Sequence, residues 1–110
     1  MIELTDKNYS EEINKDRLKL IYFHTPSCPA CVGIKPILEF IENDISELDV
    51  YSCDLTRNPK ISAKYEIRSV PTTMFVDLKK NIKYAEAGIR DISYFQKCYR
   101  KLTRNKFFLF

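Results

Sequence analysis

Apolar residues recur along the chain in two patterns, one typical of buried strands and one typical of a helix with a single buried face. Residues 18–24 (LKLIYFH) form an apolar, aromatic run of strand length, which predicts a central strand. From residue 34 onward, apolar side chains are spaced so that they share one face of a helix. They are Ile34, Ile37, Leu38, Ile41 and Ile45. Residues 25–31 form the tight connection between the two.

The remaining segments continue an alternation of strands and helices. Further strands are expected at residues 2–4, 49–55, 72–77 and 82–87. Further helices are expected from a cap at Thr5 or Asp6 to Asn14, from Asn58-Pro59 to Glu66, and after a cap at Asp91, with Ile92, Phe95, Tyr99 and Leu102 on the buried face of the last one. The order is βαβαβαββα.

The connections predict how these strands pair. Only residues 78–81 separate the last two strands, so these must form an antiparallel hairpin. Strands joined through helices favour parallel pairing. The pattern therefore predicts an α/β fold with a mixed central sheet and helices on both faces.

Length and composition fit one globular domain that spans residues 1–110. The chain is 45% hydrophobic and 30% charged, which suits a domain with its own core rather than a disordered chain. Its net charge of +3 does not by itself imply nucleic acid. It has two glycines and no Gly-rich phosphate-binding motif.

The same composition bears on where the protein works. No apolar run approaches the roughly 18 residues of a membrane span. The first residues lack the basic and apolar regions of a secretory signal peptide. A monomer in the cytoplasm is therefore expected.

The C-terminal end is basic and then apolar. No acidic residue follows Asp91, and the chain closes with an apolar tail at residues 105–110 that includes Phe107-Phe108-Leu109-Phe110. This tail makes a weak contact with a membrane or a partner in one interpretation. In the other it folds back on the domain, which is favoured because four apolar residues give little membrane affinity.

The most informative motif is Cys28-Pro29-Ala30-Cys31, which falls between the predicted strand and helix. Cys28 then lies at the helix N-terminus, and Pro29 stands in the first turn, where a missing N–H is tolerated. Unpaired N–H groups and the helix dipole favour a thiolate, so the pKa of Cys28 is expected below the free value of about 8.5. Thiolates attack disulfides. Cys28 is thus the expected nucleophile, and Cys31, about one turn further on, the resolving thiol.

Two other interpretations of the cysteines are weaker. A Cys-x-x-Cys pair is also half of a zinc site, but Cys53, Cys98 and His24 offer no second paired spacing, so no metal is expected. A scaffold held together by disulfides is the other interpretation. Such scaffolds are small, secreted and have little hydrophobic core, so this interpretation is disfavoured here. Cys53 and Cys98 are expected to act as small buried hydrophobes; a regulatory disulfide between them would require Cα atoms within about 7 Å.

Together these motifs resemble those of the thioredoxin family over nearly the whole chain. The resemblance is carried by Ile2–Asp6, Tyr22-Phe23, Ser27–Cys31, Pro36, Asn58-Pro59, Tyr65–Thr72 and Gly88. It implies a thioredoxin fold and a protein-disulfide oxidoreductase that needs no bound cofactor. It also implies that Pro71 follows a cis peptide bond, faces the cysteine pair and, with Val70, helps to bind an extended substrate chain. The implied partners are disulfide-containing proteins and a thiol or flavoprotein reductase as electron donor.

The chain departs from the family at positions that tune the chemistry. Thioredoxins usually carry Trp before the first cysteine and Gly-Pro between the two; here Ser27 and Pro29-Ala30 stand there, and the chain has no Trp. Tyr22 replaces a buried Asp that accepts the proton of the resolving cysteine, and Ser52 replaces the accompanying Lys. Losing both charges avoids one buried unpaired charge.

Three functions remain open at this point. Pro29 and Val70 are similar to residues in a more oxidising branch of the family, so an oxidase or isomerase competes with a cytoplasmic reductase. A non-enzymatic binding or redox-sensing module is the third possibility. His24, the single histidine, has two interpretations. In one it supports the Cys28 thiolate or shuttles a proton near neutral pH, and in the other it fills the space of an aromatic residue.

Overall fold

The computed structural model describes the backbone of residues 1–108 and the side chains of residues 1–104. Its elements are β1 (Ile2–Glu3), α1 (Tyr9–Ile13), β2 (Leu18–His24), α2 (Pro29–Asp44), β3 (Leu48–Asp54), α3 (Pro59–Tyr65), β4 (Thr72–Val76), β5 (Ile82–Ala87) and α4 (Ile92–Phe108). This order confirms the predicted βαβαβαββα pattern, with several boundaries shifted by one residue.

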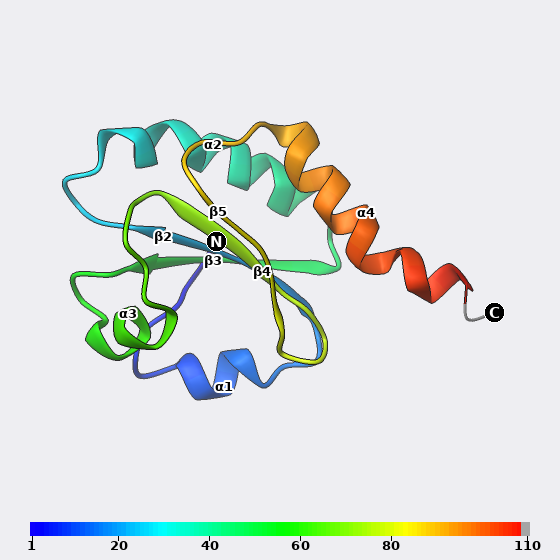
Figure 1. Ribbon diagram of the computed structural model, residues 1–110, viewed down its shortest axis with the longest axis horizontal. Coiled ribbons are helices and arrows are strands. Elements are labelled where there is room, and N and C mark those ends of the chain that lie inside the picture. The colour runs from blue at the N-terminus through cyan, green and yellow to red at the C-terminus, as the bar shows by residue number, and fades with distance from the viewer. Residues whose placement is uncertain (109–110) are drawn as a thin grey trace.

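The strands form one mixed sheet in the order β1-β3-β2-β4-β5. Strand β3 pairs in parallel with both β1 and β2, while β4 pairs antiparallel with both β2 and β5. Helices α2 and α4 cover one face of the sheet, and α1 and α3 lie on the other (Figure 1). The predicted thioredoxin fold, with helices on both faces, is confirmed.

Strand β2 supplies both cores because its side chains alternate between the two faces. Leu20 and Tyr22 pack under α2 and α4, where Ile34, Leu38 and Ile41 are fully buried. Ile21 and Phe23 point to the opposite face, towards α1 and α3. Burial on both faces explains why β2 is a nearly continuous apolar run in the sequence. Two members of the predicted face of α2, Ile37 and Ile45, are only partly buried at its margin.

Helix α1 begins later than predicted, and the cause is a local hydrogen-bond exchange. The Asn8 amide N–H donates to Thr5 Oγ1 at 3.2 Å, and the Thr5 amide N–H donates to Asn8 Oδ1 at 2.8 Å. Neither Thr5 nor Asp6 caps α1, whose N-cap residue is Asn8. Asp6 instead accepts from the amides of Lys60 and Ile61, at the start of α3. The prediction of a cap for α1 at Thr5 or Asp6 is therefore wrong.

Among the helices of the described residues, none combines the length and the hydrophobicity that crossing a membrane requires. The apolar C-terminal tail predicted at residues 105–110 lies outside the residues whose side chains the structure describes. Its contact with a membrane or a partner stays a prediction.

Candidate active site

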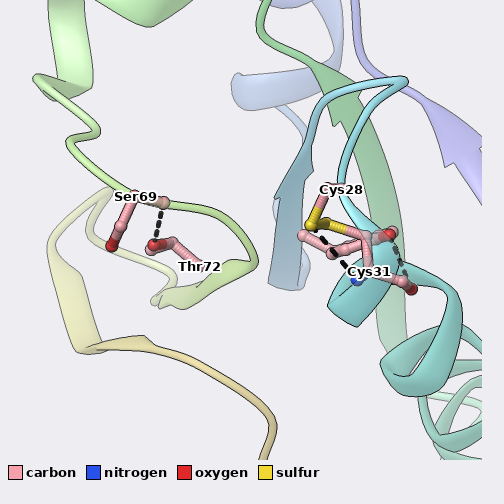
Figure 2. Close-up of a disulfide and its surroundings, with 5 residues drawn as sticks. Cys28, Cys31, Ser69 and Thr72 are labelled. Carbon is pink, nitrogen blue, oxygen red and sulfur yellow. Dashed lines mark hydrogen bonds between the residues drawn. A yellow bond between two sulfur atoms is a disulfide. The ribbon is translucent and has the colours of Figure 1, made fainter.

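The disulfide between Cys28 and Cys31 lies where β2 leads into α2, with the two Cα atoms 5.3 Å apart (Figure 2). Cys28 is the N-cap residue of α2, in an extended conformation, and Pro29 opens the helix. The Cys31 amide N–H donates to Cys28 Sγ at 3.2 Å. A hydrogen bond of this kind stabilises a thiolate when the pair is reduced.

The two sulfur-bearing residues differ in exposure. Cys28 is half-buried, whereas Cys31 is 4% exposed and belongs to the core under α2. Cys28 is therefore the more accessible residue of the pair.

The loop before β4 lies next to the cysteine pair. The Val70–Pro71 peptide bond is cis, and Val70 packs against the same core cluster as Cys28 and Cys31. The hydroxyl of Thr72 donates to the Ser69 carbonyl oxygen at 2.7 Å and closes this turn, which Figure 2 shows beside the disulfide. The Gly88 amide N–H donates to the Pro71 carbonyl oxygen at 2.8 Å. These bonds fix the loop that carries Val70 and Pro71.

Tyr22 lies against the buried side of the cysteine pair. Its side chain is 4% exposed, and its hydroxyl donates to the Cys31 carbonyl oxygen at 3.0 Å. Its ring stacks on that of His24, with centroids 5.0 Å apart and planes 26° apart. Burial raises the pKa of Tyr22 above its ordinary value. In the register of the sheet Tyr22 is paired with Ser52, so the two positions at which the resemblance leads one to expect a buried Asp and Lys are direct neighbours.

A cavity of about 620 Å³ lies next to the disulfide. Tyr22, His24 and Ser52 line it together with Cys28 and Cys31, while charged side chains also contribute: Glu3, Lys35, Glu39 and Arg57. Neither Val70 nor Pro71 lines it. Reasoning from the sequence missed this cavity, because its walls come from β1, β2, β3, α2 and the loop after β3.

His24 is half-buried in this cavity wall. Burial lowers the pKa of His24 below its ordinary value, the nearby Asp54 carboxylate opposes this shift, and Lys35 adds to it. The imidazole is therefore neutral at pH 7. A neutral imidazole is able to accept a proton.

The other two cysteines lie in separate cores. Cys53 packs on the α1 and α3 side of the sheet, and Cys98 on the α2 and α4 side. Both are free and buried. Burial raises the pKa of Cys53 to about 12 and also raises that of Cys98, so neither is a thiolate at neutral pH. The sheet lies between them, which excludes the alternative of a disulfide joining Cys53 and Cys98 in this fold.

Within the part of the chain that the structure describes, no group of three or more His, Cys, Asp or Glu residues is arranged to hold a metal ion. The cysteine pair is already bonded to itself. What the arrangement offers chemically is a reversible two-electron couple between two sulfur atoms.

Comparison with known proteins agrees with this geometry. The thioredoxin family model matches residues 1–98. A thioredoxin of Rickettsia bellii is 40% identical over 73 residues, covering 64% of this chain and 70% of that protein. A thioredoxin of Staphylococcus haemolyticus is 34% identical over 73 residues, covering 66% of this chain and 69% of that protein.

A longer relative matches only in part. Protein disulfide-isomerase 1 of Caenorhabditis elegans is 27% identical over 88 residues, which are 76% of this chain and 18% of that protein. The fold, the Cys28–Cys31 disulfide and these matches lead to one conclusion. The chain belongs to the thioredoxin family and is a protein-disulfide oxidoreductase.

Proposed function

We propose that the protein reduces disulfides of protein substrates in the cytoplasm, with Cys28 as nucleophile and Cys31 as resolving thiol. The observation that carries this assignment is the asymmetry of the pair. Cys28 is half-buried, caps α2 and accepts a hydrogen bond from the Cys31 amide, whereas Cys31 is buried behind it. Residues 1–110 act as one domain and as a monomer in this proposal.

The reaction has two exchange steps. The Cys28 thiolate attacks one sulfur of the substrate disulfide, forms a mixed disulfide and releases the other substrate sulfur as a thiolate. The Cys31 thiolate then attacks Cys28 Sγ, which forms the Cys28–Cys31 disulfide and releases the second substrate sulfur. The substrate gains two electrons and the cysteine pair loses two. A dithiol or a flavoprotein reductase returns them, so no bound cofactor is required.

An extended segment of substrate binds beside the pair, along Val70 and Pro71. Two exposed apolar side chains, one on the first turns of α2 and one packed against them, support this location. Val32 follows Cys31 directly and is 74% exposed. Ile89 is 48% exposed and reaches α2, where its Cδ1 lies 3.4 Å from the position that a Cβ of Gly33 would occupy. Apolar surface at this place gains free energy when a substrate chain covers it.

The reduction potential of the pair separates this proposal from an oxidase or isomerase. Known potentials in this fold run from about −270 mV for a reductase to about −120 mV for a strong oxidant, a span of roughly 7 kcal/mol for two electrons. Equilibration with glutathione buffers, followed by quantification of free thiols, gives the value for Cys28 and Cys31. A potential near the upper end would replace the reductase with an oxidase.

Activity separates both enzymes from a binding module. The wild-type protein is expected to reduce insulin disulfides with dithiothreitol as donor, and a variant with both Cys28 and Cys31 changed to serine is expected to be inactive. The buried pair Cys53 and Cys98 provides the matched control, because serine at those two positions leaves the couple in place. Equal activity of the wild type and the Cys28, Cys31 double variant would contradict an enzymatic role.

A further inference from the structure

The second exchange step requires Cys31 to lose a proton, and its surroundings include no obvious acceptor. Cys31 is 4% exposed, and burial disfavours a thiolate. Tyr22 is hydrogen-bonded to Cys31 through its hydroxyl group, which donates to the Cys31 carbonyl oxygen. Burial also raises the pKa of Tyr22, so its phenol stays protonated. Tyr22 therefore positions Cys31 and does not take its proton.

The cavity beside the disulfide connects Cys31 with His24. Both residues line it, and the His24 ring stacks on the same Tyr22 ring whose hydroxyl holds Cys31. The cavity has walls that are partly polar and about 620 Å³ of space, which is ample for several water molecules. We propose that His24 accepts the proton of Cys31 through water in this cavity while the mixed disulfide is resolved. This inference rests on the proposed function.

A water molecule takes the Cys31 proton and passes one to the unprotonated nitrogen of His24, which becomes imidazolium. The Cys31 thiolate attacks Cys28 Sγ, the Cys28–substrate bond breaks, and the substrate leaves as a thiolate. The imidazolium then returns its proton to that thiolate or to bulk water. His24 is neutral again for the next cycle.

The charged groups around His24 suit this role. They are Glu3 on β1, Asp54 on β3, Lys35 and Glu39 on α2, Arg57 in the loop after β3, and the amino group of Met1, which is paired with Glu42. Burial and Lys35 keep the imidazole neutral at rest, and Asp54, its partner in the register of β2 and β3, stabilises the imidazolium.

The carboxylates around His24 are less well placed than His24 to accept the Cys31 proton. Glu39 lies eight residues beyond Cys31 on α2, about 12 Å along the helix axis. Glu3 is on β1, two strand spacings or about 10 Å from β2. Asp54 already accepts hydrogen bonds from the amide and the hydroxyl of Thr56. The His24 ring, by contrast, stacks on the Tyr22 ring, whose hydroxyl is hydrogen-bonded to Cys31.

The test follows the two exchange steps separately with 5,5′-dithiobis(2-nitrobenzoate). Attack by Cys28 releases one coloured thiolate, and attack by Cys31 on the resulting mixed disulfide releases a second. The variant His24→Phe keeps a ring that can stack on Tyr22 but cannot accept a proton. We expect it to slow the second release at pH 7 by about tenfold or more, which is less than the roughly hundredfold that a positioned base typically contributes, because water remains as a poorer acceptor.

The pH profile distinguishes a proton acceptor from a packing role. In the wild type the rate of the second release rises with an inflection below about 6.5, the ordinary pKa of histidine, because burial lowers the pKa of His24. His24→Phe and His24→Gln both lose this inflection. Glu39→Gln removes a charge from the same cavity and serves as the matched control, with the inflection retained.

The possible outcomes separate the two proposals. The role of His24 is overturned if the second release in His24→Phe and His24→Gln keeps the wild-type rate and pH profile. Equal slowing of both releases also overturns it, since His24 would then act on Cys28. A wild-type protein that gives no first release contradicts the proposed function itself, because Cys28 would not be a nucleophile.

Discussion

The hydroxyl group of Tyr22 donates a hydrogen bond to the backbone carbonyl oxygen of Cys31 at 3.0 Å. A neutral side chain therefore occupies the buried side of the cysteine pair. The neighbouring strand offers Ser52 at the paired position. The sheet beneath α2 therefore lacks the carboxylate and ammonium that the family usually places there, and tyrosine fills that volume with a ring and one hydrogen bond.

A carboxylate at position 22 is expected to accelerate turnover and destabilise the fold. In Tyr22→Asp the new side chain lies beside Cys31, where it is able to accept its proton, but Ser52 provides no cation. We expect faster insulin reduction at pH 7 and a loss of about 3 kcal/mol in the free energy of unfolding, because an aromatic ring is lost from the core and a charge is buried.

The stability loss in Tyr22→Asp depends on pH with a definite sign. Burial raises the folded-state pKa of the new carboxyl above its unfolded value of about 3.9, so the folded state binds more protons between the two values. Stability is therefore lost as the pH rises above about 3.9. Melting temperatures at pH 5 and pH 8 measure this, with Tyr22→Asn as a control that does not titrate. Parallel losses in the two variants at both pH values would show that position 22 is not desolvated.

The exposed apolar surface at Val32 is expected to matter for protein substrates alone. Val32→Asn replaces the apolar side chain on the first turns of α2 with an uncharged polar one, so we expect the KM for insulin to rise severalfold, while the reaction with 5,5′-dithiobis(2-nitrobenzoate) changes little. Leu78→Asn is the matched control, since Leu78 is another exposed apolar residue, in the turn between β4 and β5. If both variants behaved alike with insulin, substrate would not dock at Val32.

The carboxylate of Asp6 is expected to stabilise α3. It accepts from the amides of Lys60 and Ile61 at 3.1 and 3.0 Å, where the N-cap residue Asn58 makes no side-chain cap. Asp6→Ala is expected to lower the free energy of unfolding by about 1 kcal/mol, measured in urea, because a helix cap is lost. Asp16→Ala is the control, since the Asp16 side chain is 97% exposed. An Asp6→Ala variant as stable as this control would mean that other groups satisfy these amides.

The order of elements was predictable because each segment carries its own periodicity. The side chain that satisfies the first amides of α3 was not predictable, because Asp6 acts across more than fifty residues of sequence. The environment of Lys19 was also not predictable from the sequence. This residue stands inside an apolar strand and is fully buried, since its ammonium group reaches the carbonyl oxygens of Lys15 and Arg17. Only the packed chain shows that those acceptors are within reach.

Strand β5 was predicted with its correct bounds, but not its irregularity. The register between β4 and β5 shifts between Thr73 and Phe75, and Tyr84 has a φ of 53°. A residue in this conformation turns a strand locally. The Tyr84 ring consequently packs edge-on against Phe75, with centroids 6.2 Å apart. Nothing in the alternation of residues 82–87 marks this bulge.

The cysteine pair, Val70-Pro71 and Tyr22 were all identified from spacing and family resemblance, and the fold brings Tyr22 and Val70 against the same core as the pair. The cavity that joins Cys31 to His24 was not predictable. It depends on the volume left between Ser52, Tyr22 and α2 after packing. Spacing along one strand places Tyr22 and His24 on one face, but it says nothing about the space in front of them.

The roles of Cys28 and Cys31 are tested by finding which of the two cysteines holds a substrate covalently. Cys31→Ser retains the half-buried Cys28 but has no thiol to resolve the mixed disulfide, so it is expected to accumulate as a covalent complex with a disulfide-bonded protein. Cys28→Ser leaves only the buried Cys31 and is expected to form none. Non-reducing electrophoresis and mass spectrometry after incubation with insulin measure both. Equal trapping by the two variants, or trapping by Cys28→Ser alone, would contradict the assignment of Cys28 as the nucleophile.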